Sequence, residues 1–109
     1  LNIKVAKRAL KDFNFIIDEV KDGNEAVAKV KSGVKYDLIL MDIMMPGMSG
    51  DETLAKLKED SNFRIPVIAV TADVEAGSET KYLSQGFTSY IGKPFTRDQI
   101  KEELDKIFK

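Results

Sequence analysis

Short runs of consecutive apolar residues alternate along this chain with longer stretches in which apolar residues recur at helical spacing. The runs are bounded by turn residues and contain many β-branched side chains, a pattern typical of strands buried on both faces of a parallel sheet. We therefore predict strands over residues 15–20, 36–41, 65–70 and 88–92.

Helical spacing of apolar residues predicts one helix before each of these strands and another after the last. The second helix follows turn and N-cap residues at Asp22-Gly23-Asn24 and is stopped by Ser32-Gly33, and Gly86 is placed to end the fourth. The other predicted helices cover residues 2–13, 51–60, 75–85 and 96–109.

The strict alternation of helices and strands, with short connections, predicts one α/β domain built as a doubly wound parallel sheet with helices on both faces. A length of 109 residues agrees with a single domain. The chain nevertheless opens on a predicted helix, whereas a doubly wound sheet normally opens on a strand.

The amino-acid composition excludes several classes of catalytic and binding site. The chain has neither histidine nor cysteine, which excludes Ser-His and Cys-His nucleophiles, thiolate metal sites and disulfides within it. Its 17 basic and 18 acidic residues give a net charge of −1, so no excess positive charge favours binding to nucleic acid.

The apolar runs are far shorter than the roughly 20 residues that span a bilayer, and no signal-peptide pattern opens the chain. We expect a cytoplasmic protein without membrane insertion.

Three polar residues follow the apolar runs where successive strands are predicted to end: Asp42, Thr71 and Lys93. Because the carboxyl ends of parallel strands meet at one edge of a sheet, these side chains should converge there. A carboxylate, a hydroxyl and an ammonium group together can coordinate a divalent metal, or hold and accept a phosphoryl group.

Each of these residues also has a purely structural interpretation. The carboxylate could cap a turn, the hydroxyl could bond the backbone, and the lysine could be a solvated charge at a strand end. Tyr90, near the end of the last predicted strand, could simply pack at the sheet edge. Three complementary groups at three successive strand ends nevertheless favour a shared site.

The segments that contain these residues resemble a known family. They read MDIMMPGMSG at 41–50, VTA at 70–72 and YIGKPF at 90–95. They are similar to the receiver domains of two-component response regulators, of the kind found in chemotaxis regulators and in hybrid sensor histidine kinases. The resemblance extends over essentially all of residues 1–109, and it implies a flavodoxin-like fold with strand order 2-1-3-4-5.

The resemblance implies that Asp42 accepts a phosphoryl group from a phosphohistidine on a histidine kinase or a histidine phosphotransfer protein. Asp42 and the backbone carbonyl of Met44 would bind the required Mg²⁺. Lys93 would pair with the phosphoryl oxygens, and the Thr71 hydroxyl and the Ala72 amide would also bind phosphate. Such a domain catalyses its own phosphorylation and dephosphorylation without being an ordinary enzyme.

The same resemblance implies a conformational switch. When Thr71 moves to the phosphoryl group, it vacates space into which Tyr90 turns. The active surface would lie on the fourth helix, fifth strand and fifth helix, where a downstream effector or a second copy of the domain binds. Direct contact with nucleic acid is not implied.

The chain departs from the family at its beginning. The first strand of a receiver, and the two adjacent acidic residues that bind Mg²⁺, have no counterpart in residues 1–109, so we expect a receiver that is incomplete at its N-terminus. Because missing ligands weaken metal binding, a phosphorylation-independent protein-interaction module with the receiver fold is the alternative function. A flavin-binding, flavodoxin-like protein is a third alternative, and it predicts visible absorbance.

Overall fold

The computed structural model describes residues 20, 22–43, 47–72, 77–92 and 96–108. Helices and strands alternate within these ranges as α2 (Gly23–Lys31), β1 (Ile39–Asp42), α3 (Gly50–Lys58), β2 (Val67–Thr71), α4 (Ser78–Gln85), β3 (Ser89–Gly92) and α5 (Arg97–Phe108). This order confirms the predicted alternation. The predicted helix over 2–13, and the predicted strand over 15–20 apart from Val20, lie outside the described residues.

The strands form a parallel sheet in the order β1-β2-β3. Ile39 pairs with Val67 at the start of the first strand pair, and Ile68 pairs with Ser89 at the start of the second. Parallel neighbours require a crossover connection, which α3 and α4 supply. The arrangement confirms the parallel α/β sheet and agrees with the last three strands of the expected order.

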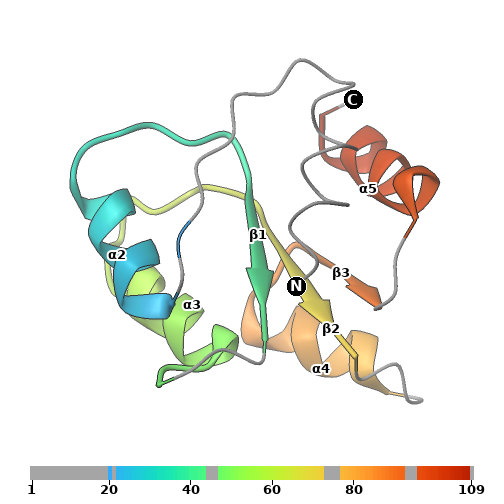
Figure 1. The fold of residues 1–109 in the computed structure, drawn as a ribbon, viewed down its shortest axis with the longest axis horizontal. Coiled ribbons are helices and arrows are strands. Elements are labelled where there is room, and N and C mark those ends of the chain that lie inside the picture. The colour runs from blue at the N-terminus through green and yellow to red at the C-terminus, as the bar shows by residue number, and fades with distance from the viewer. Residues whose placement is uncertain (1–19, 21, 44–46, 73–76, 93–95, 109) are drawn as a thin grey trace.

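Helices cover both faces of this sheet, as expected for a doubly wound fold (Figure 1). On one face, here the α5 face, the buried core consists of Ile68, Val70, Ile91, Ile100 and Leu104. On the other, here the α4 face, it consists of Met41, Ile43, Leu54, Leu57, Val67, Ala69, Tyr82 and Phe87, with α2 packed alongside. The division follows from strand geometry, because successive residues of a strand point to opposite faces.

β1 and β2 each continue past the apolar residues predicted to end them, to Asp42 and Thr71. The backbone pairing explains this extension. Thr71 pairs with Gly92, and beyond Asp42 the Ile43 N–H still donates to the Val70 carbonyl at 3.0 Å. A strand end is set by the backbone ladder rather than by side-chain polarity.

The C-terminal end of α4 is a tightly bonded turn. Gly86 follows the helix with φ 108°, a left-handed conformation that favours glycine, which confirms its predicted role. Its N–H donates to the Leu83 carbonyl at 3.1 Å, and the Phe87 N–H donates to the Tyr82 carbonyl at 3.2 Å. This Schellman pattern brings the side chains of Tyr82 and Phe87 together, with ring centroids 6.0 Å apart.

Polar side chains cap the N-terminal ends of several helices. The Asp22 carboxylate caps α2, as its position in the sequence predicted, and the Ser49 hydroxyl accepts from the Glu52 N–H at 3.4 Å. Thr96 and Gln99 each bond the other's backbone N–H before α5, which is a capping box. None of the helices among the described residues is long and apolar enough to cross a membrane.

Candidate functional site

The carboxyl ends of the three strands lie at one edge of the sheet. β1 ends at Asp42, β2 at Thr71 and β3 at Gly92, and the register pairs Thr71 with Gly92. The structure therefore places the strand ends that carry Asp42 and Thr71 side by side. Lys93 directly follows Gly92 in the sequence, but Lys93 and Met44 both lie outside the described residues.

Asp42 is half-buried, and the backbone that follows it is held from two directions. The Ile43 N–H donates to the Val70 carbonyl at 3.0 Å, and the Ile43 carbonyl accepts from the Gly50 N–H at 2.9 Å. A Cβ atom on Gly50 would lie 2.6 Å from the Asp42 carbonyl oxygen, so glycine is what lets α3 approach this closely. The start of α3 thus fixes the backbone from which the Asp42 carboxylate projects.

Thr71 is almost fully buried, with 2% of its surface exposed. Its side chain points to the same face of the sheet as those of Val67 and Ala69, the α4 face, because alternate residues of a strand share a face. Its hydroxyl oxygen is 3.3 Å from the hydroxyl oxygen of Tyr82 on α4. Ala72, whose amide the resemblance assigned to phosphate, comes next and is exposed. The end of β2 therefore joins a buried hydroxyl to an exposed residue.

Tyr90 is half-buried and faces α4 from β3. Its ring centroid lies 6.0 Å from that of Tyr82, with the two ring planes inclined by 37°. Tyr82 consequently contacts both residues that the resemblance assigned to the switch: its hydroxyl lies beside Thr71, and its ring lies beside Tyr90.

The sequence interpretation missed Tyr82. The two buried residues of α4 are Ser78 and Tyr82, which stand one helical turn apart and therefore mark the side of the helix that meets the sheet. That spacing is a usable signal, because only the tyrosine is long enough to carry a hydroxyl from the helix to a strand end.

Among the described residues at this edge, Asp42 could contribute to a metal site. Its carboxylate is the kind of hard oxygen ligand that Mg²⁺ prefers, so this side chain is chemically suited to bind magnesium. Within the described part of the chain, no three His, Cys, Asp or Glu side chains gather closely enough to hold a metal ion. The Met44 carbonyl, the other expected ligand, lies outside that part.

Comparison with known sequences gives a consistent result. The family described as "Response regulator receiver domain" matches residues 1–105. Chemotaxis protein CheY-3 of Vibrio cholerae is 35% identical over 107 residues, which cover 96% of this chain and 82% of that protein. Hybrid signal transduction histidine kinase L of Dictyostelium discoideum is 35% identical over 112 residues, which cover 97% of this chain. The present chain spans 7% of that kinase's length.

Solved structures agree with the sequence comparisons. The receiver domain of sensor histidine kinase PA1611 from Pseudomonas aeruginosa matches with a TM-score of 0.85 at 30% identity, covering 97% of this chain and 87% of that one. That structure has a magnesium ion coordinated in its active site cleft. Full-length ShkA in complex with AMPPNP matches with a TM-score of 0.83 at 33% identity, covering 99% of this chain and 22% of ShkA.

Proposed function

Because this chain belongs to the response regulator receiver domain family, we propose that it accepts a phosphoryl group on Asp42 from a phosphohistidine partner. The observation that carries the proposal is the position of Asp42 and Thr71 at one edge of a parallel sheet, with Lys93 next in sequence after the third strand. This edge is where open parallel sheets bind their ligands.

Transfer to Asp42 forms one bond and breaks another. A carboxylate oxygen of Asp42 attacks the phosphorus, the phosphorus–nitrogen bond of the phosphohistidine breaks, and the released imidazole takes up a proton. Residues 1–109 contain no histidine, so the donor belongs to another domain or protein, namely a histidine kinase or a histidine phosphotransfer protein. Asp42 and the Met44 carbonyl would hold Mg²⁺, which would supply charge neutralisation for the transferred oxygens.

Three further groups hold the transferred phosphoryl group in this proposal. The Lys93 ammonium pairs with its oxygens, the Thr71 hydroxyl donates a hydrogen bond to it, and the Ala72 amide donates another. The exposed position of Ala72, directly after the buried Thr71, supports this assignment because the phosphoryl group arrives from solvent.

We assign the responsive surface to α4, β3 and α5, where a downstream effector or a second copy binds. An open groove of about 650 Å³ lies there, and its lining includes Leu83, Tyr90 and Ile107. Leu83 is 43% exposed, so the groove offers apolar surface to a partner. Because Tyr90 lines this groove and also contacts Tyr82 in the interior, a turn of its ring changes the surface that the partner meets.

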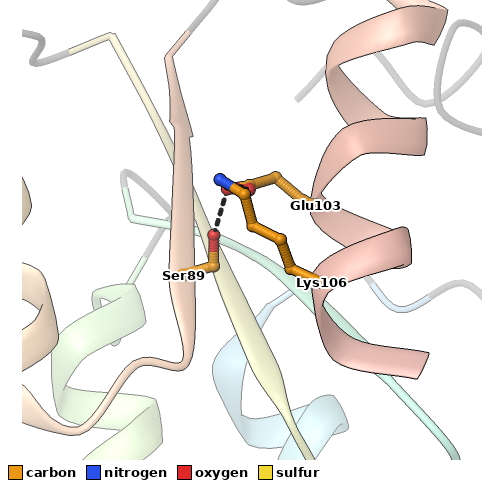
Figure 2. Close-up of polar contacts among 3 residues, drawn as sticks. All are labelled: Ser89, Glu103 and Lys106. Atoms are coloured by element: carbon orange, nitrogen blue, oxygen red, sulfur yellow. Dashed lines mark hydrogen bonds and ion pairs between the residues drawn. The ribbon is translucent and has the colours of Figure 1, made fainter. Parts of the chain in front are cut away.

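One hydrogen bond joins α5 to β3 on one side of the groove, and an ion pair within α5 lies beside it (Figure 2). The Ser89 hydroxyl donates to Glu103 Oε1 at 2.7 Å, and Lys106 Nζ lies 3.3 Å from Glu103 Oε2. The Glu103 side chain is only 15% exposed, whereas that of Lys106 is 72% exposed, so it is the Ser89 hydrogen bond that is partly shielded from water. This hydrogen bond helps to hold α5 against β3.

The experiment that tests this function uses the full-length protein that contains the chain. Incubation with acetyl phosphate and Mg²⁺ should add one phosphoryl group, detected by intact mass and by phosphate-affinity electrophoresis. Asp42→Asn should abolish incorporation because an amide is not a nucleophile for phosphorus, and chelation of Mg²⁺ should slow it. Asp37→Asn, the same change at an exposed aspartate before β1, is the matched control.

Two outcomes would contradict the proposal. One is an Asp42→Asn variant that incorporates as much phosphoryl group as the wild type. The other is a wild-type protein that is folded by circular dichroism and incorporates none with Mg²⁺ present. The second outcome would favour the phosphorylation-independent interaction module.

A further inference from the structure

Tyr82 lies between the two residues of the proposed switch. Its hydroxyl oxygen is 3.3 Å from that of Thr71, and its ring centroid is 6.0 Å from that of Tyr90. Thr71 and Tyr82 are both 2% exposed. The contact between their hydroxyls is therefore shielded from water, where a hydrogen bond has little competition.

We propose that Tyr82 is a positioning residue that holds Thr71 and Tyr90 in the resting arrangement, and that it thereby sets how readily Asp42 binds a phosphoryl group. This inference rests on the proposed phosphoacceptor function. It assigns to α4 an active part in the switch, because Tyr82 belongs to that helix.

Strand geometry places Thr71 and Asp42 on opposite sides of the sheet. The Thr71 side chain points to the same face as Ala69, which belongs to the α4-face core. The Asp42 side chain points to the same face as Leu40, which packs against the α5-face core. To donate to a phosphoryl group on Asp42, the Thr71 hydroxyl must turn away from Tyr82. Threonine rotamers are separate wells about 120° apart, so the hydroxyl leaves Tyr82 in one step.

The ring of Tyr82 is itself held in place. Phe87 contacts it edge to face, with an interplanar angle of 85°, and this contact belongs to the Schellman turn that ends α4. Lys81 Nζ lies 5.3 Å from the ring centroid. A ring held in this way forms a fixed wall beside Tyr90. Thr71 and Tyr90 thus contact the same side chain, Thr71 at its hydroxyl and Tyr90 beside its ring.

The hydrogen bond between Thr71 and Tyr82 favours the resting state, since it is made there and is exchanged when Thr71 turns. One net hydrogen bond of ordinary strength shifts an equilibrium by roughly fivefold. A ligand that binds only the switched state must overcome this bias, so its apparent affinity is lower by the same factor.

The test is Tyr82→Phe in the full-length protein, which keeps the ring and removes the hydroxyl. We expect the apparent affinity for beryllofluoride with Mg²⁺, an analogue of the phosphoryl group on aspartate, to rise about fivefold. Titration followed by tyrosine fluorescence measures this affinity. Tyr36→Phe makes the same change at a half-buried tyrosine before β1 and should bind like the wild type.

Variants at Thr71 show whether the effect passes through the observed contact. In a Thr71→Ala background, Tyr82→Phe should leave the beryllofluoride affinity unchanged, because the partner hydroxyl is already gone. In a Thr71→Ser background, which restores a hydroxyl, Tyr82→Phe should raise the affinity again. A merely structural role for the Tyr82 hydroxyl would lower the melting temperature and would not produce this pattern of affinities.

The outcomes distinguish this inference from the function on which it rests. If Tyr82→Phe and the wild type bind beryllofluoride equally, or if the gain persists in the Thr71→Ala background, the role of Tyr82 is overturned and the phosphoacceptor function stands. If a folded wild-type protein binds no beryllofluoride, both are overturned.

Discussion

The two faces of the sheet are built from different kinds of side chain. The buried core of the α5 face is entirely aliphatic. The α4 face instead gathers aromatic rings and a buried hydroxyl, from Tyr82, Phe87, Tyr90 and Thr71. Aliphatic side chains are held by shape and burial, whereas rings and hydroxyls make directional contacts that can be exchanged for others.

We infer from this difference that the α5 face mainly stabilises the fold, whereas the α4 face carries the proposed switch. Ile68 and Val70 lie on the central strand and anchor α5 against the α5 face. Thr71, the next residue of the same strand, turns to the α4 face and meets Tyr82. Under the proposed switch, one strand therefore contributes to a static core on one side and to an exchangeable contact on the other.

The largest expected effect is on stability, from truncation within the α5 face. Ile100 is fully buried, so Ile100→Ala should lower the free energy of unfolding by about 2–5 kcal/mol. Urea denaturation measures the loss, and beryllofluoride affinity per folded molecule should not change. Ile100→Val, at about 0.5–1.5 kcal/mol, provides a milder version if the alanine variant does not fold. If an Ile100 variant changed the beryllofluoride affinity as much as Tyr82→Phe does, the proposed difference in role between the two faces would be wrong.

The next effect concerns the edge where the two faces meet. In Gly50→Ala the new Cβ atom would crowd the Asp42 carbonyl oxygen, which is backbone and cannot step aside. We expect a loss of about 1–3 kcal/mol in the free energy of unfolding together with slower phosphorylation from acetyl phosphate. Lys56→Ala, at an exposed position of α3, is the control and should change neither quantity. A Gly50→Ala protein with wild-type stability and rate would show that the close approach is not needed.

The smallest effects come from a matched pair of conservative changes, one on each face. Phe87→Leu and Ile91→Val both alter buried residues and should each cost about 1 kcal/mol of unfolding free energy. Only Phe87→Leu should also change the beryllofluoride affinity, because Phe87 holds the Tyr82 ring. Thermal denaturation and the same titration measure the two quantities. Equal affinity changes in both variants would contradict the comparison.

Much of the fold could be predicted from local patterns. The apolar runs marked β1, β2 and β3, since strands buried on both faces need apolar residues at consecutive positions. The same runs located Asp42 and Thr71, because the first polar residue after such a run stands at the strand end. The parallel order then placed these ends at one edge.

The contact of Tyr82 with Thr71 could not be predicted in this way. The two residues are joined by the packing of α4 on the sheet, and α4 carries a weak apolar pattern in which Ser78 is one of the two buried residues. Local periodicity reports which side of a helix is buried, but it does not report which strand residue that side meets.

The turn after α4 is hydrogen-bonded to the helix at its start and to β2 at its end. The Phe87 N–H is bonded back to α4, while Thr88 exchanges hydrogen bonds with Val67, its N–H donating to the Val67 carbonyl at 2.8 Å and its hydroxyl accepting from the Val67 N–H at 3.2 Å. A connection so short and so extensively hydrogen-bonded limits how far the C-terminal end of α4 can move away from the sheet. On the proposed binding surface, a partner would therefore meet this end of the helix at a nearly constant distance from β2.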